Sequence, residues 1–446
     1  MQDSKELWQS KLFFSTELLQ WYERSKRDLP WRRHRDPYYI WISEIMLQQT
    51  RVDTVIPYFQ RFIERFPTIQ DLAEAPEEDV LKCWEGLGYY SRARNLQAAA
   101  RQVVERHGGA VPDNKAEVAA LKGVGPYTTG AIMSIAFNRP EPAVDGNVMR
   151  VLSRYFLIEE DIMKTATRTL MEELATELIP EGRASDFNQA LMELGALVCT
   201  PKSPQCLICP VMARCAGRLE GAEERLPVKS KAKPPRPEYR LVALVEGDGE
   251  NAGRVLVRRR PDTGLLARMW ELPHIPADAV PGEGAGLPDG PAMDRLTAAL
   301  AEAGPGVMAR PEGPFLNAEH TFSHIHWNLR VFRFAAVSGH AVHGGRLAED
   351  YAAEASAAYE IGAADQRLPA ASPQPGAADL VPDRVNAGPM PRPGTKQPAP
   401  GFVPAVVEIA ASSDSEYRWI TREDMNSLAF PNVFLRILNH YFDTRA

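Results

Sequence analysis

The stretch that decides the fold is Leu121–Arg150, LKGVGPYTTGAIMSIAFNRPEPAVDGNVMR. Its glycine turn, Gly123-Val124-Gly125, separates two segments whose apolar spacing predicts helices. Glycines on both sides of an apolar residue let the backbone approach another molecule closely, with amide N–H groups pointing outward. At a helix N-terminus such a turn suits an anion, for example a phosphate. Because many helix hairpins use glycine simply to turn, the turn alone indicates no function.

A carboxylate follows the turn at a fixed distance. Asn138–Pro142 predicts a rigid loop, after which Asp145-Gly146-Asn147 leads into another helix. An aspartate directly before a helix commonly serves as its N-cap. The residues alone favour the cap and leave a chemical role for Asp145 open.

The rest of the first half also reads as helices, with no convincing strand up to residue 220, so we expect an all-α domain. The predicted helices are Lys5–Arg24, Ile40–Thr50, Val52–Phe66, Thr68–Ala75, Glu78–Trp84, Ser91–His107 and Ala116–Ala120. Glu44 lies within the second of these, where a solvated helix face is the simplest reading.

A glycine loop with two tyrosines, Gly86–Tyr90, precedes Arg92 and Arg94. Aromatic rings beside arginines suit contact with a base stack and a phosphate. Tyrosines at the edge of a core give the same pattern, and the residues do not choose between the two.

Four of the five cysteines, Cys199, Cys206, Cys209 and Cys215, form a C-x6-C-x2-C-x5-C loop. Four clustered thiols in a reduced compartment indicate a metal site. Zinc is the generic occupant, but zinc sites usually show two tight cysteine pairs, whereas this loop has one. A single pair with wider arms suits a 4Fe–4S cluster. Cys83 is predicted to be a core residue.

The length, the net charge and the hydropathy of the chain limit its domain number, partners and location. A chain of 446 residues predicts two or three domains. The net charge of −7 neither supports nor excludes a nucleic-acid partner. The N-terminal sequence resembles no secretion signal and no run approaches a membrane span, so we expect a cytoplasmic monomer without membrane contact.

The predicted secondary structure changes from helices to a mixture of strands and helices after a basic, proline-rich linker at 229–238. Strands are predicted at Tyr239–Glu246, Arg254–Arg259, Arg330–Val337 and Glu416–Ile420, and helices at Met293–Ala303 and Phe434–Tyr441. We therefore expect an α+β domain at 239–446, after a first domain at 1–228. Its Ala/Pro/Gly-rich segment 340–412 has the composition of a disordered insert.

Five motifs, in this order along the chain, together resemble a known family of proteins. They are SEIMLQQTRV (Ser43–Val52), EGLGYYSRARNL (Glu85–Leu96), LKGVGPYTTGAI (Leu121–Ile132), VDGNVMRVLSR (Val144–Arg154) and the cysteine loop. Together they resemble the helix-hairpin-helix DNA glycosylases, over roughly Leu7 to Cys215, and within them the branch that removes adenine. GLLARMWELP (Gly264–Pro273) and EHTFSHIHW (Glu319–Trp327) extend the resemblance into a Nudix-like second domain.

The resemblance implies removal of adenine mispaired with 8-oxoguanine or guanine in double-stranded DNA. It makes Glu44 the general acid that protonates N7 of the adenine, for which its pKa must be raised. Asp145 would stabilise the sugar cation, and Asn147 would position Asp145 or the water. Tyr127 stands where strand-cutting relatives carry a lysine, and a phenol forms no Schiff base. This implies a glycosylase that leaves the strand uncut.

The resemblance to this family also implies which residues contact the DNA. Gln49 and Tyr89 would wedge into the duplex around the orphaned partner, with Thr50 and Leu87 beside it, and backbone at Gly123 and Gly125 would hold phosphates. The adenine pocket would comprise Arg27, Trp31, Arg32, Leu47, Val52 and Gln189.

The second domain would read the oxidised base. Phe322-Ser323-His324 matches the FSH loop of the family, and Ser323 would contact 8-oxoguanine. Pro291–Gly304, where a Nudix hydrolase carries clustered glutamates, offers only Asp294, Arg295 and Glu302, which argues against nucleotide hydrolysis. Two other functions stay open: a bifunctional glycosylase and lyase for oxidised pyrimidines, and a non-catalytic iron–sulfur protein that marks lesions.

Overall fold

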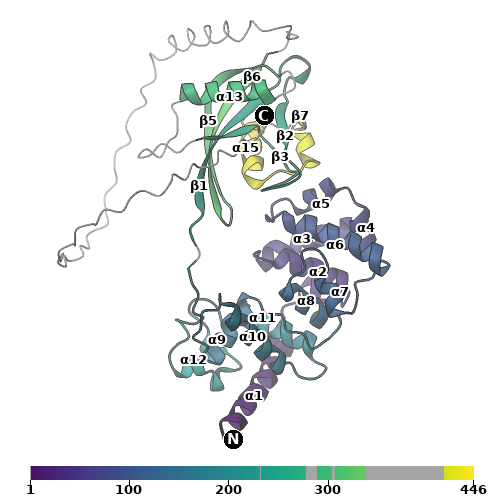
Figure 1. The fold of residues 1–446 in the computed structure, drawn as a ribbon, viewed down its shortest axis with the longest axis vertical. Helices are drawn as coiled ribbons and strands as arrows, with labels where there is room; N and C mark the ends of the chain where they lie inside the picture. The colour runs from purple at the N-terminus through teal and green to yellow at the C-terminus, as the bar shows by residue number, and fades with distance from the viewer. Residues whose placement is uncertain (1, 232, 278–288, 304–306, 338–415, 446) are drawn as a thin grey trace, which may run out of the picture. The chain divides into compact units, whose positions relative to one another are not determined.

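Helices alone build the first part of the chain (Figure 1). The computed structural model describes residues 2–231, 233–277, 289–303, 307–337 and 416–445. The α-helices before the sheet are α1 Gln2–Ser25, α2 Pro37–Leu47, α3 Val52–Arg65, α4 Ile69–Glu74, α5 Glu77–Trp84, α6 Ser91–His107, α7 Lys115–Ala119, α8 Pro126–Ala131, α9 Gly146–Tyr155, α10 Thr165–Leu178, α11 Ala184–Leu197 and α12 Ala216–Leu219. Because the described residues before Arg236 contain no strand, the predicted all-α first domain is confirmed.

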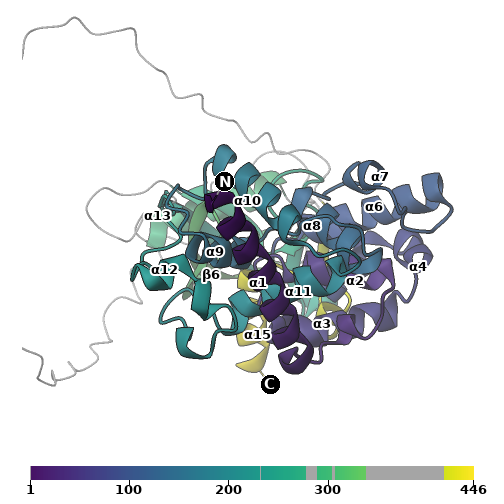
Figure 2. The ribbon, with the colours of Figure 1, turned by 90° about the horizontal axis from the view of Figure 1, so that it is seen from below.

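The helices pack around two large apolar cores, and Ile40, Ala131, Ile135 and Ala143 form a smaller third cluster. One core takes residues from α2 to α6, and the other takes residues from α1, α9, α10 and α11. In Figure 2, α1 runs across α10 and α11. The Ser15 hydroxyl of α1 donates a 2.6 Å hydrogen bond to the Leu178 carbonyl at the end of α10. The segment that decides the fold connects the two cores, since α7 and α8 follow α6 and lead on to α9.

The predicted glycine turn joins α7 to α8. Gly123 has a φ of 78°, and a Cβ there would lie 2.7 Å from the Cβ of Asn95, so only glycine fits. Gly125 is the N-cap of α8 in extended backbone, and nothing lies within 4 Å of the position that its Cβ would take. The surface in front of Gly125 is therefore open. After α8 the chain continues as a π-helical segment, η2, Ile132–Ala136.

Helix α2 ends at Leu47, so the predicted extension to Thr50 is wrong. Gln48 leaves the helical region with a ψ of 112°, and Gln49 has a φ of 60°. The left-handed region is unfavourable for a residue with a Cβ, so it stops the helix. The helical spacing of apolar residues ends before this point and carries no sign of the turn.

The second domain is built on one mixed sheet. Its strands are β1 Arg236–Glu246, β2 Val255–Arg259, β3 Trp270–Glu271, β4 His274–Ala277, β5 Ala309–Thr321, β6 Ile325–Ala336 and β7 Tyr417–Ile420, with helices α13 Asp289–Ala303 and α15 Asn432–Asp443. The main path is β3-β2-β1-β6-β5, with β4 on β1 and β7 on β2, and β1 runs parallel to β6. The α+β prediction is confirmed, although β1 starts inside the segment predicted as linker.

The alternation along β1 explains how both faces are covered. Leu241, Ala243 and Val245 pack in the core that α13 closes, whereas Val242 and Leu244 pack in the core that α15 closes. Successive side chains of a strand point to opposite faces, so an unbroken apolar run suits a strand buried on both sides. The sheet is therefore a middle layer between two helices (Figure 1).

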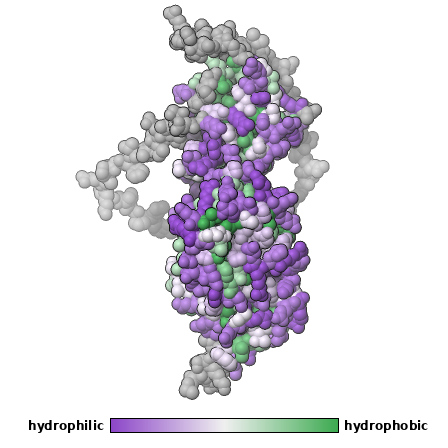
Figure 3. Space-filling model, turned by 90° about the vertical axis from the view of Figure 1, so that its right-hand side faces the viewer, coloured by the Kyte–Doolittle hydropathy of each residue, from purple (hydrophilic) through white to green (hydrophobic). Residues whose placement is uncertain are grey.

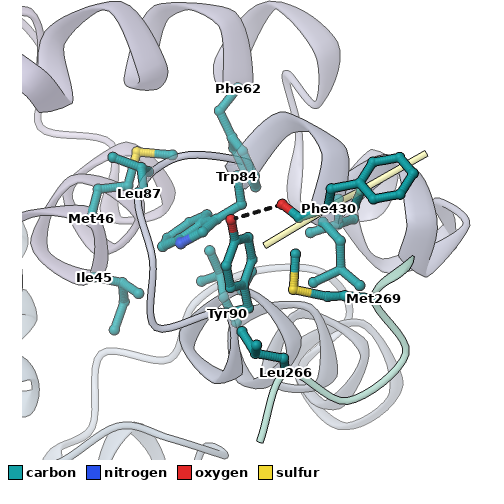
Figure 4. Close-up of a cluster of buried hydrophobic side chains, with 14 of the residues drawn as sticks. Ile45, Met46, Phe62, Trp84, Leu87, Tyr90, Leu266, Met269 and Phe430 are labelled. Carbon is teal, nitrogen blue, oxygen red and sulfur yellow. Dashed lines mark hydrogen bonds between the residues drawn. The ribbon is translucent and has the colours of Figure 1, made fainter. Parts of the chain in front are cut away.

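The contact between α5, the following loop and the C-terminal segment is also apolar. In Figure 4, Trp84 and Tyr90 lie between Ile45 and Met46 on one side and Phe430 on the other. The Tyr90 hydroxyl donates a 3.4 Å hydrogen bond to the Phe430 carbonyl, and the Phe430 N–H donates to Glu85 at 2.8 Å. The loop before α6 is thus packed from both sides.

The predicted insert at 340–412 lies outside the described residues. Among the described helices, none combines the length and the apolar character that crossing a membrane requires. On the face drawn in Figure 3 hydrophilic residues predominate, with smaller apolar patches between them.

Candidate active site

Glu44 lies on α2 with only 5% of its surface exposed. The interpretation of Glu44 as a solvated residue is therefore wrong. The pKa of its carboxyl is raised to about 7: burial is the largest cause and the nearby Asp145 adds to it, while a hydrogen bond from Tyr127 and the charge of Arg32 oppose the shift. A substantial fraction of this carboxyl is protonated at neutral pH.

Tyr127, on α8, is the direct partner of this carboxyl. Its hydroxyl donates to Glu44 Oε2 at 2.5 Å and lies 3.3 Å from the Met192 sulfur. Burial raises the pKa of Tyr127 well above its usual value, and the neighbouring carboxylates add to the shift. The phenol therefore stays neutral and acts as a hydrogen-bonding group.

Asp145 is the N-cap of α9, as its sequence position predicted. Its Oδ1 accepts from the Val148 N–H at 2.8 Å, and its Oδ2 accepts from the Asn147 side-chain amide at 2.7 Å. Burial raises the pKa of Asp145, while the hydrogen bonds from Val148 and Asn147 oppose the shift. Both oxygens have partners, so the carboxylate is held in one orientation.

These side chains share one cavity of about 170 Å³. Every residue that the sequence placed in the adenine pocket lines it, together with Thr50 and the four proposed catalytic residues. The lining consists of Arg27, Leu29, Trp31, Arg32, Ile40, Ser43, Glu44, Leu47, Thr50, Val52, Tyr127, Ile135, Asp145, Asn147, Gln189, Met192, Glu193 and Ala196. Residues far apart in sequence thus meet in one cavity, whose lining is both apolar and charged and includes three carboxyls, those of Glu44, Asp145 and Glu193.

Glu193, which the sequence did not indicate as a site residue, accepts hydrogen bonds from both arginines of the cavity. Arg27 donates to both carboxylate oxygens, at 2.9 and 2.7 Å, and Arg32 donates to Oε2 at 2.8 Å. Burial would raise the pKa of Glu193, but the hydrogen bonds from Arg27 and Arg32 outweigh it and lower the pKa to about 2. The carboxylate therefore stays ionised and offsets the positive charge beside Glu44. Its i, i+4 spacing from Gln189 on α11 was the one available signal.

The proposed wedge residues lie on two tight loops. Gln49 is exposed with a φ of 60°, and Tyr89 is 45% exposed with a φ of 49°. By contrast, Leu87 and Tyr90 are buried in the core. The sequence left open whether these tyrosines contact a partner or pack at the edge of a core. Tyr89 projects outward, as contact with a partner requires, whereas Tyr90 packs in the core.

The arginines beside this loop do not project toward a partner. Arg94 donates to the Ala267 carbonyl at 2.8 Å, and Arg92 donates to carbonyls of both loops. The sequence left a phosphate contact open for these arginines, and backbone carbonyls hold both terminal nitrogens of Arg92 and one terminal nitrogen of Arg94.

Phe322-Ser323-His324 forms the hairpin turn between β5 and β6. The Phe322 N–H donates to the Ile325 carbonyl at 2.7 Å, and the Phe322 ring packs on Trp327 with centroids 5.0 Å apart. Ser323 and His324 are exposed at the tip. The turn thus presents two polar side chains on a rigid aromatic base.

Cys199, Cys206, Cys209 and Cys215 line a second cavity, and no disulfide joins them. The buried Arg154 donates to the Cys199 sulfur at 3.3 Å. In the described part of the chain, no three metal-binding side chains lie close enough to hold a single ion. Cys83 lies elsewhere, packed against the core as predicted.

Comparison with known proteins agrees with this geometry. Residues 42–179 match the HhH-GPD superfamily of base excision DNA repair proteins, and residues 245–371 match a NUDIX domain. The fold is thus a helix-hairpin-helix glycosylase fold followed by a Nudix-like domain.

Individual relatives are more specific. The chain is 41% identical to the adenine DNA glycosylase of Rattus norvegicus, over 59% of this chain and 60% of that protein. It is 36% identical to the adenine DNA glycosylase of Buchnera aphidicola subsp. Baizongia pistaciae, over 59% of this chain and 74% of that protein. The chain belongs to the adenine DNA glycosylase family.

The chain spans about 60% of the length of the rat and mouse relatives that it matches. The solved structure of a thermostable thymine-DNA glycosylase is 32% identical and covers 48% of this chain and 98% of its own, with a TM-score of 0.44.

Proposed function

We propose that the protein hydrolyses the N-glycosidic bond of adenine mispaired with 8-oxoguanine or guanine in double-stranded DNA. The observation that carries the proposal is a buried carboxyl with a pKa of about 7, Glu44, in one cavity with a second, fixed carboxylate, Asp145. Two carboxyls in different environments are the usual means of breaking a glycosidic bond. The names of the curated relatives support adenine as the leaving base.

Glu44 acts as the general acid. Its proton goes to N7 of the adenine, which then leaves as a neutral base instead of an anion. The Tyr127 hydroxyl, 2.5 Å from Oε2, orients the carboxyl. Glu193 supports the same protonation state, because it offsets the positive charge of Arg32, which favours the anion of Glu44.

Asp145 stabilises the cation left on the sugar. An ionised carboxylate held by Val148 and Asn147 is already oriented before the charge develops, so little reorganisation is needed. Water then attacks the sugar. Because Tyr127 is a neutral phenol and forms no Schiff base, the enzyme leaves the strand uncut.

The adenine reaches the cavity by leaving the duplex. Gln49 and Tyr89 enter the space around the orphaned base, and amides at Gly123 and Gly125 bind the phosphate backbone. The open surface in front of Gly125 supports this contact. The protein acts on duplex DNA as a monomer.

The Nudix-like domain reads the base opposite the adenine, with Ser323 at the hairpin tip contacting 8-oxoguanine. Replacing both Ser323 and His324 with alanine should reduce the preference for A:8-oxoguanine over A:G more than it reduces the bond-breaking rate. Their side chains are exposed and the turn is held by backbone bonding, so the fold should persist. Single-turnover rates on the two duplexes measure the preference. An unchanged ratio contradicts this role.

The four-cysteine cavity binds a 4Fe–4S cluster, through Cys199, Cys206, Cys209 and Cys215, with Arg154 offsetting its negative charge. The purified protein should therefore show broad visible absorption. Cys209→Ser should lose it, whereas Cys83→Ser, outside the cavity, should keep it. Stoichiometric zinc without visible absorption in the wild-type protein contradicts the cluster.

Adenine release tests the proposed function. Excess protein is mixed with a duplex carrying one A:8-oxoguanine pair, with A:T and C:8-oxoguanine duplexes as controls. The proposal expects free adenine from the mispair alone. Release of an oxidised pyrimidine with strand cleavage supports the bifunctional alternative instead.

A further inference from the structure

Arg92 joins the two loops that carry the proposed wedge residues. Its Nη1 donates to the carbonyls of Ile45, at 2.7 Å, and Met46, at 3.2 Å, and also to the Gln48 carbonyl. Its Nη2 donates to the Gly88 carbonyl at 3.2 Å and to the Leu87 carbonyl at 3.4 Å. One guanidinium thus binds the end of α2 on one side and the tyrosine loop on the other.

The position of Arg92 on α6 is unfavourable for a positive charge. It lies in the first turn of α6, where the helix dipole opposes positive charge. The guanidinium reaches instead to the C-terminal end of α2, where the last carbonyls have no partner within the helix and favour a cation. Burial lowers the pKa of Arg92 to about 10, so it remains charged at neutral pH. The charge therefore has a structural use beyond α6.

Both loops hold strained backbone at the residue that projects outward. Gln49 has a φ of 60° and Tyr89 a φ of 49°, in the region that non-glycine residues avoid. Such conformations persist where the surrounding structure determines them. Two of the five carbonyls that Arg92 binds, those of Gln48 and Gly88, lie immediately before these residues. The Arg92 guanidinium also lies 5.5 Å from the centroid of the Tyr89 ring and 5.4 Å from that of Trp84.

We propose that Arg92 is a positioning residue that holds both wedge loops in their inserting conformation before DNA binds. The role follows from the planar fork of arginine, which spans two backbone segments at once, whereas an ammonium group is a single point of contact. The inference rests on the proposed function, because it assigns the loops to displacement of the adenine from the duplex. It also links them to Glu44, since the anchored end of α2 lies one residue beyond it.

Arg92→Lys tests the role, because it keeps the charge and loses the fork. We expect release of adenine from an A:8-oxoguanine duplex to slow by about 10- to 100-fold, as misplaced positioning groups do. With the adenine opposite an abasic site, where no base pair must be broken, the loss should shrink to about 3-fold or less. Arg101→Lys is the matched control: Arg101 is on the same helix and donates to the carbonyls of Ala73 and Ala75, away from both loops.

Amide hydrogen exchange gives a readout that does not depend on catalysis. Arg92→Lys should speed exchange in residues 48–50 and 87–90 and leave the α9 amides unchanged. An equal loss of rate on both duplexes, or unaltered exchange in both loops, overturns the proposal. If wild-type protein releases no adenine, the proposed function fails, and the exchange measurement alone then decides whether Arg92 fixes the loops.

Discussion

Replacing Glu44 with glutamine is expected to slow adenine release by about 10²- to 10⁴-fold, the usual contribution of a positioned general acid. Glutamine fills the same space and still accepts the hydrogen bond from Tyr127. It has no proton of suitable acidity to give to N7. Single-turnover kinetics on an A:8-oxoguanine duplex measure the loss. A variant whose rate is within about threefold of wild type contradicts the assignment.

The pH dependence separates this role from a purely structural one. Because the pKa of Glu44 is about 7, the wild-type rate constant should be highest below pH 7 and fall about tenfold per pH unit well above it. The residual rate of Glu44→Gln should lack this alkaline limb. Asp145 must be ionised, and its raised pKa places an acid limb above the usual range of aspartate.

Replacing Glu44 with glutamine lowers the rate but is expected to raise the stability of the folded protein above neutral pH. The folded-state pKa of Glu44 is raised, so the native protein binds this proton more tightly than the unfolded chain does. As pH rises from the ordinary carboxyl pKa of 4.5 to about 7, the unfolded chain ionises at Glu44 before the native protein does, and the wild type loses stability. Glu44→Gln removes this loss. At pH 8 the variant should be more stable by up to about 3 kcal/mol, and at pH 4 the two should be similar.

Asp145→Asn is the second change with a large expected effect. Asparagine is as good an N-cap as aspartate, so α9 and the thermal stability should be preserved. The negative charge that faces the sugar cation is lost, and adenine release should slow by about 10²- to 10³-fold.

A matched variant distinguishes the cap from the charge. Asp145→Ala loses both and should also destabilise the protein by about 1 kcal/mol. Thermal unfolding and single-turnover rates are measured for the two variants side by side. If Asp145→Asn keeps the wild-type rate, Asp145 is a cap and nothing more.

Periodicity predicted most of the helices, because burial of one face imposes it on the sequence. Helix α6 has the predicted limits, Ser91–His107, and the α+β character of the second domain is confirmed. β5, Ala309–Thr321, was missed because two prolines and a glycine interrupt its pattern. It becomes a strand through pairing with β6, which no local signal reports.

The site was predictable where a family motif marks it and not elsewhere. Glu44, Asp145 and Tyr127 lie in distinctive motifs, and the structure brings all three to one cavity. Glu193 has no local motif, and its partners Arg27 and Arg32 are 166 and 161 residues away in sequence. Arg92 presented a cation beside tyrosines, which suggested a phosphate contact. Only the fold shows that backbone carbonyls use its donors.

The central claim is that this cavity removes adenine and leaves the strand intact. One single-turnover time course tests it, with wild-type protein in excess over an A:8-oxoguanine duplex, while free adenine and strand length are followed in the same samples. The account predicts stoichiometric adenine, an intact strand until alkali is added, and no covalent adduct after borohydride. A strand that keeps its adenine contradicts the account.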